Sequence, residues 1–166
     1  MDFLYIILIV IAVIVFLIYK KQKSAPLSKE QSMENIKAQI AYKEERLLDH
    51  IKTNHLKDYM TTESALFECG RTNFIRLSER FKHDDAKLTQ VIKDWTDYME
   101  ILDDAVYESE LLDVSTEEGE GEEHWKRRDE LYIQIQEIEK RFKDLLGKEY
   151  TDPEELMKLK RKSPNK

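Results

Sequence analysis

The sequence predicts an all-α protein in which a single N-terminal transmembrane helix is followed by an elongated antiparallel bundle of three or four long helices. Three observations lead to this prediction. An apolar stretch without charges occupies 3–19, and the chain beyond it is rich in Glu, Lys, Leu and Ile but has no run of β-branched residues. Glycine and proline, which interrupt helices, occur only four and three times. Apolar residues beyond the anchor recur at steps of three and four, the spacing of one helical face.

The stretch from Phe3 to Tyr19 contains 17 residues and no charge, proline or glycine. At about 1.5 Å per residue it would span roughly 26 Å, slightly less than the ~30 Å hydrocarbon core of a bilayer. The lysines that follow can extend to the lipid headgroups, and tyrosine rings favour the membrane interface. The residues expected to contact the lipid bilayer are Phe3, Tyr5, Tyr19, Lys20, Lys21 and Lys23.

The order of charges distinguishes a retained anchor from a cleaved signal peptide. A signal peptide carries positive charge before its apolar region and a small-residue cleavage site after it. Here the lysines follow the apolar region, and the small pair Ser24-Ala25 leads directly into Pro26. The sequence therefore predicts a single-pass anchor over 1–23. Because positive flanks stay in the cytoplasm, the N-terminus is expected outside, with residues 24–166 at the cytoplasmic side of the cell (inner or plasma) membrane.

The charge balance narrows the classes of partner. The chain has a formal net charge of −7, and since the first 23 residues contribute one acid against three lysines, or +2, the remainder carries −9. Binding to nucleic acid requires a basic footprint, so this acidic part argues against a general nucleic-acid-binding role. The single cysteine excludes an internal disulfide, as expected in a reducing compartment.

A short linker over 24–28 separates the predicted anchor from a helical bundle over 29–147. The linker contains a proline, which interrupts the membrane helix, and a serine near its end can cap the next helix. This first bundle helix is expected to bend at 53–55, where the apolar phase slips, and Thr61-Thr62 is a second candidate bend. Its predicted apolar face contains Met33, Ile36, Ile40, Leu47, Leu48 and Ile51.

The most regular pattern in the chain runs from Phe74 to Ala105 with alternating steps of three and four. Its breadth predicts a helix at the centre of the bundle, in contact with two neighbours. The turn before it is expected at 69–72, but the apolar phase also continues back through Phe67. Asp84 is the one polar residue in the pattern, and as a helix cap it would split the element in two. The predicted seam consists of Phe74, Leu77, Phe81, Leu88, Val91, Trp95, Tyr98, Leu102 and Ala105, widened by Ile92, Met99 and Val106.

An acidic stretch precedes the last long helix. Eight acidic and no basic residues lie within 108–123, and glycines interrupt its second half, so we expect a flexible acidic loop over 113–123. The following helix is predicted over 122–146 and is ended by Gly147. Its predicted seam contains Leu131, Ile135, Ile138, Phe142 and Leu145, flanked by Trp125 and Tyr132.

The C-terminal region 148–166 is expected to contain a short helix and a basic tail. The sequence from Thr151 to Glu155 provides a capping residue, a proline for the first turn and acids near the positive end of the helix dipole. The lysines and arginine that follow are candidates for contact with the acidic loop or with the anionic inner leaflet of the membrane. Both charged segments also keep a protein soluble without any further role.

No set of residues in the sequence predicts catalysis or a cofactor. The four histidines are spread over separate segments without the spacing of a metal site, and His83 beside Asp84 and Asp85 is interpreted as a solvated helix junction. Cys69 has no His or Asp placed by sequence to activate it. A glycine-rich phosphate loop and a nucleophile elbow are also absent from the sequence. We therefore expect no enzyme activity, no metal and no cofactor.

Two groups of aromatic residues have different expected roles. Trp95 and Tyr98 lie at core spacing on the central seam. Trp125 instead begins the last helix beside the acidic loop and is followed by three basic residues, which is typical of a partner-binding anchor. Alternatively, its ring folds back onto the end of the bundle. The candidate partner-binding residues are Trp125, Lys126, Arg127 and Arg128.

Together these features favour a protein-interaction or scaffolding module held at the cytoplasmic membrane face, which binds an unidentified protein or self-associates through its helices. An accessory or regulatory subunit of a membrane complex, or a small membrane effector of host defence, is the alternative. In that case the sequence of the span itself should matter, and exchanging it for an unrelated anchor would abolish function. A helical-bundle enzyme is the third hypothesis, and retention of a metal by the purified protein would favour it.

Overall fold

The structure, a computed structural model, describes residues 29–54, 61–114 and 120–162. These residues are all-α, as predicted, with five α-helices and one 3-10 turn. The chain divides into two compact units, Met1–Gln39 and Ile40–Lys166, and the arrangement described below is that of the second. The elements are α2 (Lys29–Asn54), α3 (Thr62–Arg80), α4 (Asp85–Val114), α5 (Glu120–Leu146), η1 (Gly147–Glu149) and α6 (Pro153–Lys162).

The predicted membrane anchor and linker, with the six residues expected to contact the bilayer, lie outside the described residues. None of the helices that the structure does describe combines the length and the apolar character needed to cross a membrane.

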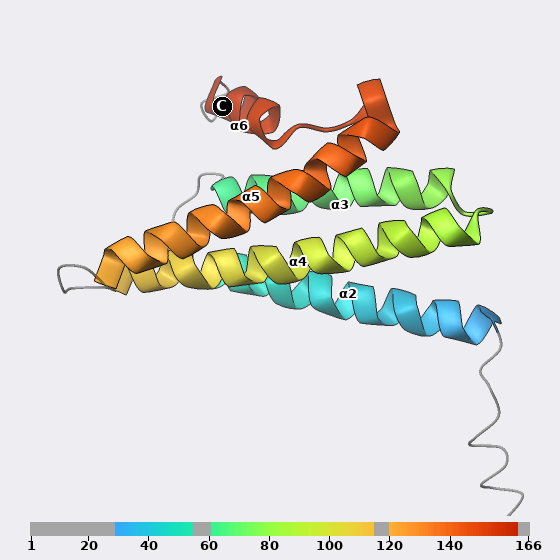
Figure 1. Cartoon of the computed structure of the whole chain (residues 1–166), viewed down its shortest axis with the longest axis horizontal. Helices are drawn as coiled ribbons and strands as arrows, with labels where there is room; N and C mark the ends of the chain where they lie inside the picture. Colours follow the sequence, from blue (N-terminus) through green and yellow to red (C-terminus); the bar gives the residue numbers. More distant parts are fainter. Residues whose placement is uncertain (1–28, 55–60, 115–119, 163–166) are drawn as a thin grey trace, which may run out of the picture. The chain divides into compact units, whose positions relative to one another are not determined.

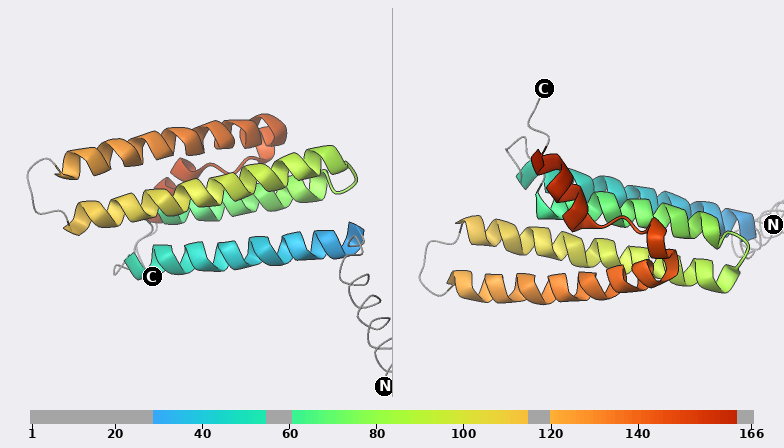
Figure 2. Two further views of the ribbon diagram at one scale, coloured as in Figure 1. Left: turned by 60° about the horizontal axis from the view of Figure 1, so that its bottom comes forward. Right: turned by 90° about the horizontal axis from the view of Figure 1, so that it is seen from above.

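The long helices of the second unit alternate in direction (Figure 1). In Figure 1, α3 and α5 run from left to right and α4 runs from right to left, and α4 packs against both α3 and α5. The part of α2 from Ile40 onward lies along the same bundle, while α6 turns back and packs on α3 (Figure 2). The predicted count of three or four long helices is thus confirmed at four for the described residues, with α6 as the short fifth helix.

The core of the bundle forms around α4. Trp95, Tyr98, Leu102 and Ala105 are completely buried, which confirms this part of the predicted central seam, whereas Phe74, Phe81, Leu88 and Ile92 are only partly buried. The ring of Trp95 stacks between Phe74 and Tyr98, at centroid separations of 5.4 Å in both cases. The neighbouring helices contribute Leu47 and Ile51 from α2, Leu66, Phe67 and Leu77 from α3, and Ile135, Ile138, Phe142 and Leu146 from α5.

The predicted continuous helix from Phe74 to Ala105 is wrong, and the alternative split at Asp84 is observed. Helix α3 ends at Arg80, and Asp84 caps α4 by accepting a hydrogen bond from the Lys87 N–H at 3.1 Å. A carboxylate at this position satisfies an otherwise unpaired donor of the new helix. The regular apolar spacing hides the break because it continues in phase across the turn.

The predicted turn at 69–72 is also wrong, because these residues lie within α3. Cys69 and Gly70 are buried there. A Cβ atom at Gly70 would lie 2.9 Å from ring atoms of both Trp95 and Tyr98. The glycine is therefore explained by the close approach of α3 to the aromatic rings of α4 rather than by a turn.

Beyond α4 the structure agrees with the sequence prediction except in the length of the acidic loop and at one seam residue. Gly147 adopts φ +58° at the end of α5, and Asp152 caps α6 by accepting the Glu154 N–H at 2.9 Å. The expected acidic loop is shorter than 113–123, because α4 continues to Val114 and α5 begins at Glu120; the residues between them lie outside the described part. The predicted seam residue Leu145 is 41 % exposed, and its neighbour Leu146 is buried instead.

Candidate functional site

Trp125 lies in the second turn of α5 and leaves 51 % of its surface exposed, so its ring is not folded into the bundle. The guanidinium carbon of Arg128 lies 3.8 Å from the centre of the ring, at cation–π distance. Arg127 pairs with Glu123 at 2.6 Å, and Lys126 is exposed. The four predicted partner-binding residues therefore lie within adjoining turns at the start of α5.

A histidine–carboxylate contact joins this part of α5 to α4. His124 Nδ1 lies 2.6 Å from Glu108 Oε2, and Arg127 Nη1 lies 3.9 Å from the other carboxylate oxygen. Glu108 is buried, so these two cationic or hydrogen-bonding partners offset the cost of removing its charge from water. The contact holds the Trp125 turn in a defined position on the bundle.

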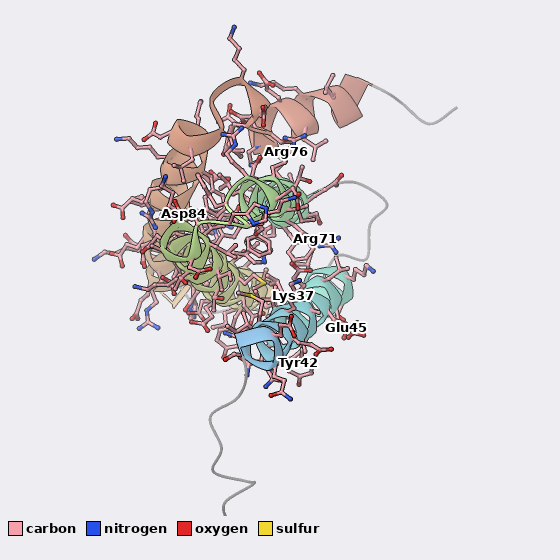
Figure 3. The ribbon with its side chains drawn as sticks, turned by 90° about the vertical axis from the view of Figure 1, so that its right-hand side faces the viewer. Lys37, Tyr42, Glu45, Arg71, Arg76 and Asp84 are labelled. Atoms are coloured by element: carbon pink, nitrogen blue, oxygen red, sulfur yellow. The ribbon has the colours of Figure 1, made fainter. Side chains whose placement is uncertain are left out.

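Polar side chains also attach α2 to the bundle. Glu44 accepts hydrogen bonds from Trp95 Nε1 and Arg71 Nε, each at 3.0 Å. The ring of His50 lies between Asp103 and Glu110, with nitrogen–oxygen distances of 2.6 and 2.9 Å. A neutral imidazole carries only one N–H, so both contacts are hydrogen bonds only when the ring is doubly protonated. Arg71 lies between α3 and α2 in Figure 3.

A cleft of about 560 Å³ lies between α3, α5 and the segment from η1 to α6. We call it the α5–α6 cleft. Its walls combine apolar side chains, tyrosine rings and charged groups from all of these elements, and Glu139 of α5 is among the lining residues. The residues that characterise it are Leu66, Tyr132, Ile135, Glu139, Tyr150, Asp152 and Met157.

Glu139 has an unusual environment in this cleft. Its pKa is raised to about 7, mainly because burial disfavours the charged form; the carboxylates of Asp152 and Glu154 contribute to the rise, while a hydrogen bond from Tyr98 and the charge of Lys143 oppose it. Tyr98 Oη lies 3.3 Å from Glu139 Oε1 and donates to the Leu66 carbonyl at 2.9 Å. A carboxyl group that titrates near neutrality within a cleft is a candidate functional group.

The wall of the cleft formed by η1 and the start of α6 is fixed to α3. The Asn73 side chain makes two hydrogen bonds to the backbone of Thr151, one donated and one accepted, both at 2.9 Å. Arg76 donates to the Thr151 hydroxyl at 2.6 Å and to the Glu149 carbonyl. In Figure 3, Arg76 lies on the side of α3 that faces this segment.

Sequence reasoning missed both Glu139 and Asn73. One glutamate among many in a helix of alternating charges resembles a solvated residue, and nothing local indicates that α6 will cover it. Asn73 lies one position before the seam residue Phe74, where an asparagine is unremarkable. The position of Glu139 next to the seam residue Ile138 is the one available signal, since a seam neighbour can be reached by an additional helix.

The described residues contain no group of three or more His, Cys, Asp and Glu side chains placed to hold a metal ion. His83 is exposed at the turn between α3 and α4. Cys69 is 1 % exposed within α3.

Substituting Glu139→Gln is expected to change how stability depends on pH. Between pH 4.5 and 7 the folded protein retains a proton on Glu139 that the unfolded chain releases, so stability falls as pH rises through this window and then levels off. Over this pH range the free energy of unfolding should fall in both proteins, but by on the order of 2 kcal/mol less in the variant than in the wild type. Urea unfolding of the full chain in zwitterionic detergent, from pH 4.5 to 8, measures the difference.

Glu137→Gln is the matched control, because Glu137 is an exposed glutamate on the same helix. It should keep the wild-type pH profile. Parallel profiles for wild type and Glu139→Gln would contradict the assignment of the titrating group.

Comparison with known proteins does not identify this chain. It matches no protein-family model, and the comparisons with curated protein sequences and with solved structures gave no match.

Proposed function

We propose that this chain is a membrane-anchored interaction module, in which the apolar stretch Phe3–Tyr19 holds an acidic helical bundle at the cytoplasmic membrane face and the start of α5 binds a partner protein. The observation that carries this proposal is the half-exposed ring of Trp125 held beneath Arg128. The apolar stretch with lysines on one side supports the anchoring part.

Trp125 has the properties of an interface anchor. Tryptophan and arginine are enriched among the residues that dominate binding energy, and a ring held in place loses little conformational freedom on binding. The His124–Glu108 contact fixes the backbone from which the ring projects. Tethering to a membrane raises the effective concentration of such a surface relative to other membrane-bound proteins, so a weak contact becomes sufficient.

Site-specific crosslinking in intact membranes tests the partner-binding part. A photoreactive amino acid replacing Trp125 should give a discrete adduct, and the same probe replacing Ile133 is the control, since Ile133 is a similarly exposed apolar residue of α5. With the partner identified, Trp125→Ala should weaken its binding about 30-fold, the equivalent of ~2 kcal/mol, while Ile133→Ala should have little effect. Equal adducts from both positions, or none from Trp125, would refute this binding surface.

Membrane insertion tests the anchoring part separately. Ile11→Arg places a charge at the centre of the span, where it costs about 3 kcal/mol on insertion scales, and should shift the chain from the carbonate-resistant membrane fraction to the soluble fraction. Ile11→Leu is the control. A C-terminal tag should be protected from external protease in intact cells. A tag digested from outside would reverse the proposed orientation.

A further inference from the structure

The α5–α6 cleft has the size of a small-molecule site. Its volume of about 560 Å³ falls within the range of roughly 300–1,000 Å³ typical of ligand pockets. Leu66, Ile135 and Met157 supply apolar surface from three different helices. A ligand with a short hydrocarbon body can therefore replace water against these side chains.

The charge within the cleft favours a positive ligand. Three carboxylates and two lysines line it. At Glu139, however, Asp152 and Glu154 each act more strongly than Lys143. Lys140 and Lys143 are exposed at the rim. Since these two acids outweigh Lys143 at the partly buried carboxyl group of Glu139, a cation there would relieve repulsion that the lysines leave uncompensated.

The tyrosine rings of the cleft add apolar surface. Tyr132 and Tyr150 both line it. Each already has a cationic side chain near its ring, with Arg128 at 5.6 Å from the Tyr132 centroid and Lys143 at 5.7 Å from that of Tyr150. Because these side chains already occupy one face of each ring, the preference of the cleft for a positive ligand is attributed to its carboxylates.

We propose that the α5–α6 cleft binds an alkylammonium group, with Glu139 as its counter-ion and the apolar wall around its hydrocarbon chain. The group can belong to a free amine or to the side chain of a lysine in a peptide, because both present the same chemistry. This inference does not depend on the Trp125 surface or on the membrane anchor.

Binding of a cation is linked to ionisation of Glu139. A group with a pKa of about 7 is mostly protonated at pH 6 and mostly ionised at pH 8, so affinity for a cation should rise about tenfold between these values. An anionic ligand would show the opposite trend, since it prefers the protonated carboxyl group. The direction of the pH dependence thus reports the sign of the ligand that the cleft selects.

The test titrates the full chain in zwitterionic detergent with n-butylammonium and follows backbone NMR shifts of residues lining the cleft. Saturable shifts, affinity that rises about tenfold from pH 6 to 8, and loss of both in Glu139→Gln but not in Glu137→Gln are expected. A peptide with one lysine, compared with its acetylated form, distinguishes a side-chain ligand from a free amine. Tighter binding of n-butyrate than of n-butylammonium, no saturation, or unchanged binding by Glu139→Gln would overturn the proposal.

Discussion

Trp95→Ala is expected to lower the free energy of unfolding by about 4 kcal/mol, the range observed when a large aromatic side chain is removed from a packed core. Trp95 is completely buried and contacts Phe74 and Tyr98 through ring stacking. The substitution leaves a cavity between α3 and α4. It also removes the indole N–H that Glu44 accepts from α2, so three helices lose a shared contact.

Trp125→Ala is the matched control, because the chain has two tryptophans and this one is half exposed. Its cost should stay below about 1 kcal/mol, as for most exposed side chains. Urea unfolding followed by circular dichroism measures both variants. Trp95→Phe separates the two effects, since it retains most of the apolar area but loses the hydrogen bond and should cost about 1–2 kcal/mol. A loss below 1 kcal/mol for Trp95→Ala would contradict the central position of α4.

The sequence was sufficient to predict this core because helical periodicity directly encodes which face is buried. The seam through Trp95, Tyr98 and Leu102 follows from spacing alone. Helix ends were less predictable, because each depends on one side chain whose role is set by its neighbours in space. Asp84 caps a helix, whereas Gly70 accommodates the rings of α4 inside another helix. Both residues interrupt an apolar pattern in the same way when only the sequence is considered.

The two candidate sites also differ in how far the sequence alone could predict them. Trp125 and its basic neighbours could be recognised because they are consecutive and out of phase with the seam. The α5–α6 cleft could not, because its properties arise only when α6 folds back beside α5. The environment of Glu139 includes residues more than ten positions further along the chain, which return towards it after the turn at Gly147. The residues near Glu139 in the sequence do not indicate that α6 will pack beside α5.

Asn73→Leu is expected to cost about 3 kcal/mol, because it removes two hydrogen bonds and leaves a backbone N–H and C=O of Thr151 without partners. Leucine has the same branched heavy-atom skeleton as asparagine and leaves no cavity, but its methyl groups are larger, so overpacking adds to the loss of hydrogen bonding. Asn73 is 2 % exposed, and water cannot easily replace the side-chain amide. The effect should concentrate in the segment from η1 to α6, which this residue fastens to α3.

Hydrogen exchange of the Thr151 amide gives the direct measurement, since its N–H donates to Asn73 Oδ1. Exchange at this amide should accelerate by about 100-fold, whereas amides in the centre of α4 should change far less. Thr72→Val is the control, because the Thr72 hydroxyl donates a hydrogen bond to the Glu68 carbonyl of its own helix, away from Thr151. Unchanged exchange at Thr151 in Asn73→Leu would show that α6 is held by other contacts.

Asn73→Leu also tests whether the position of α6 determines the pKa of Glu139 in the cleft. The raised pKa of Glu139 arises first from burial and then from Asp152 and Glu154, which belong to the segment that Asn73 holds in place. Release of that segment should expose Glu139 and remove both acids from its vicinity, so its pKa should fall from about 7 towards the ordinary value of 4.5. Titration of the Glu139 side-chain carboxyl by ¹³C NMR measures this shift. A pKa that stays near 7 in Asn73→Leu would mean that α3, α4 and α5 alone create the environment of Glu139.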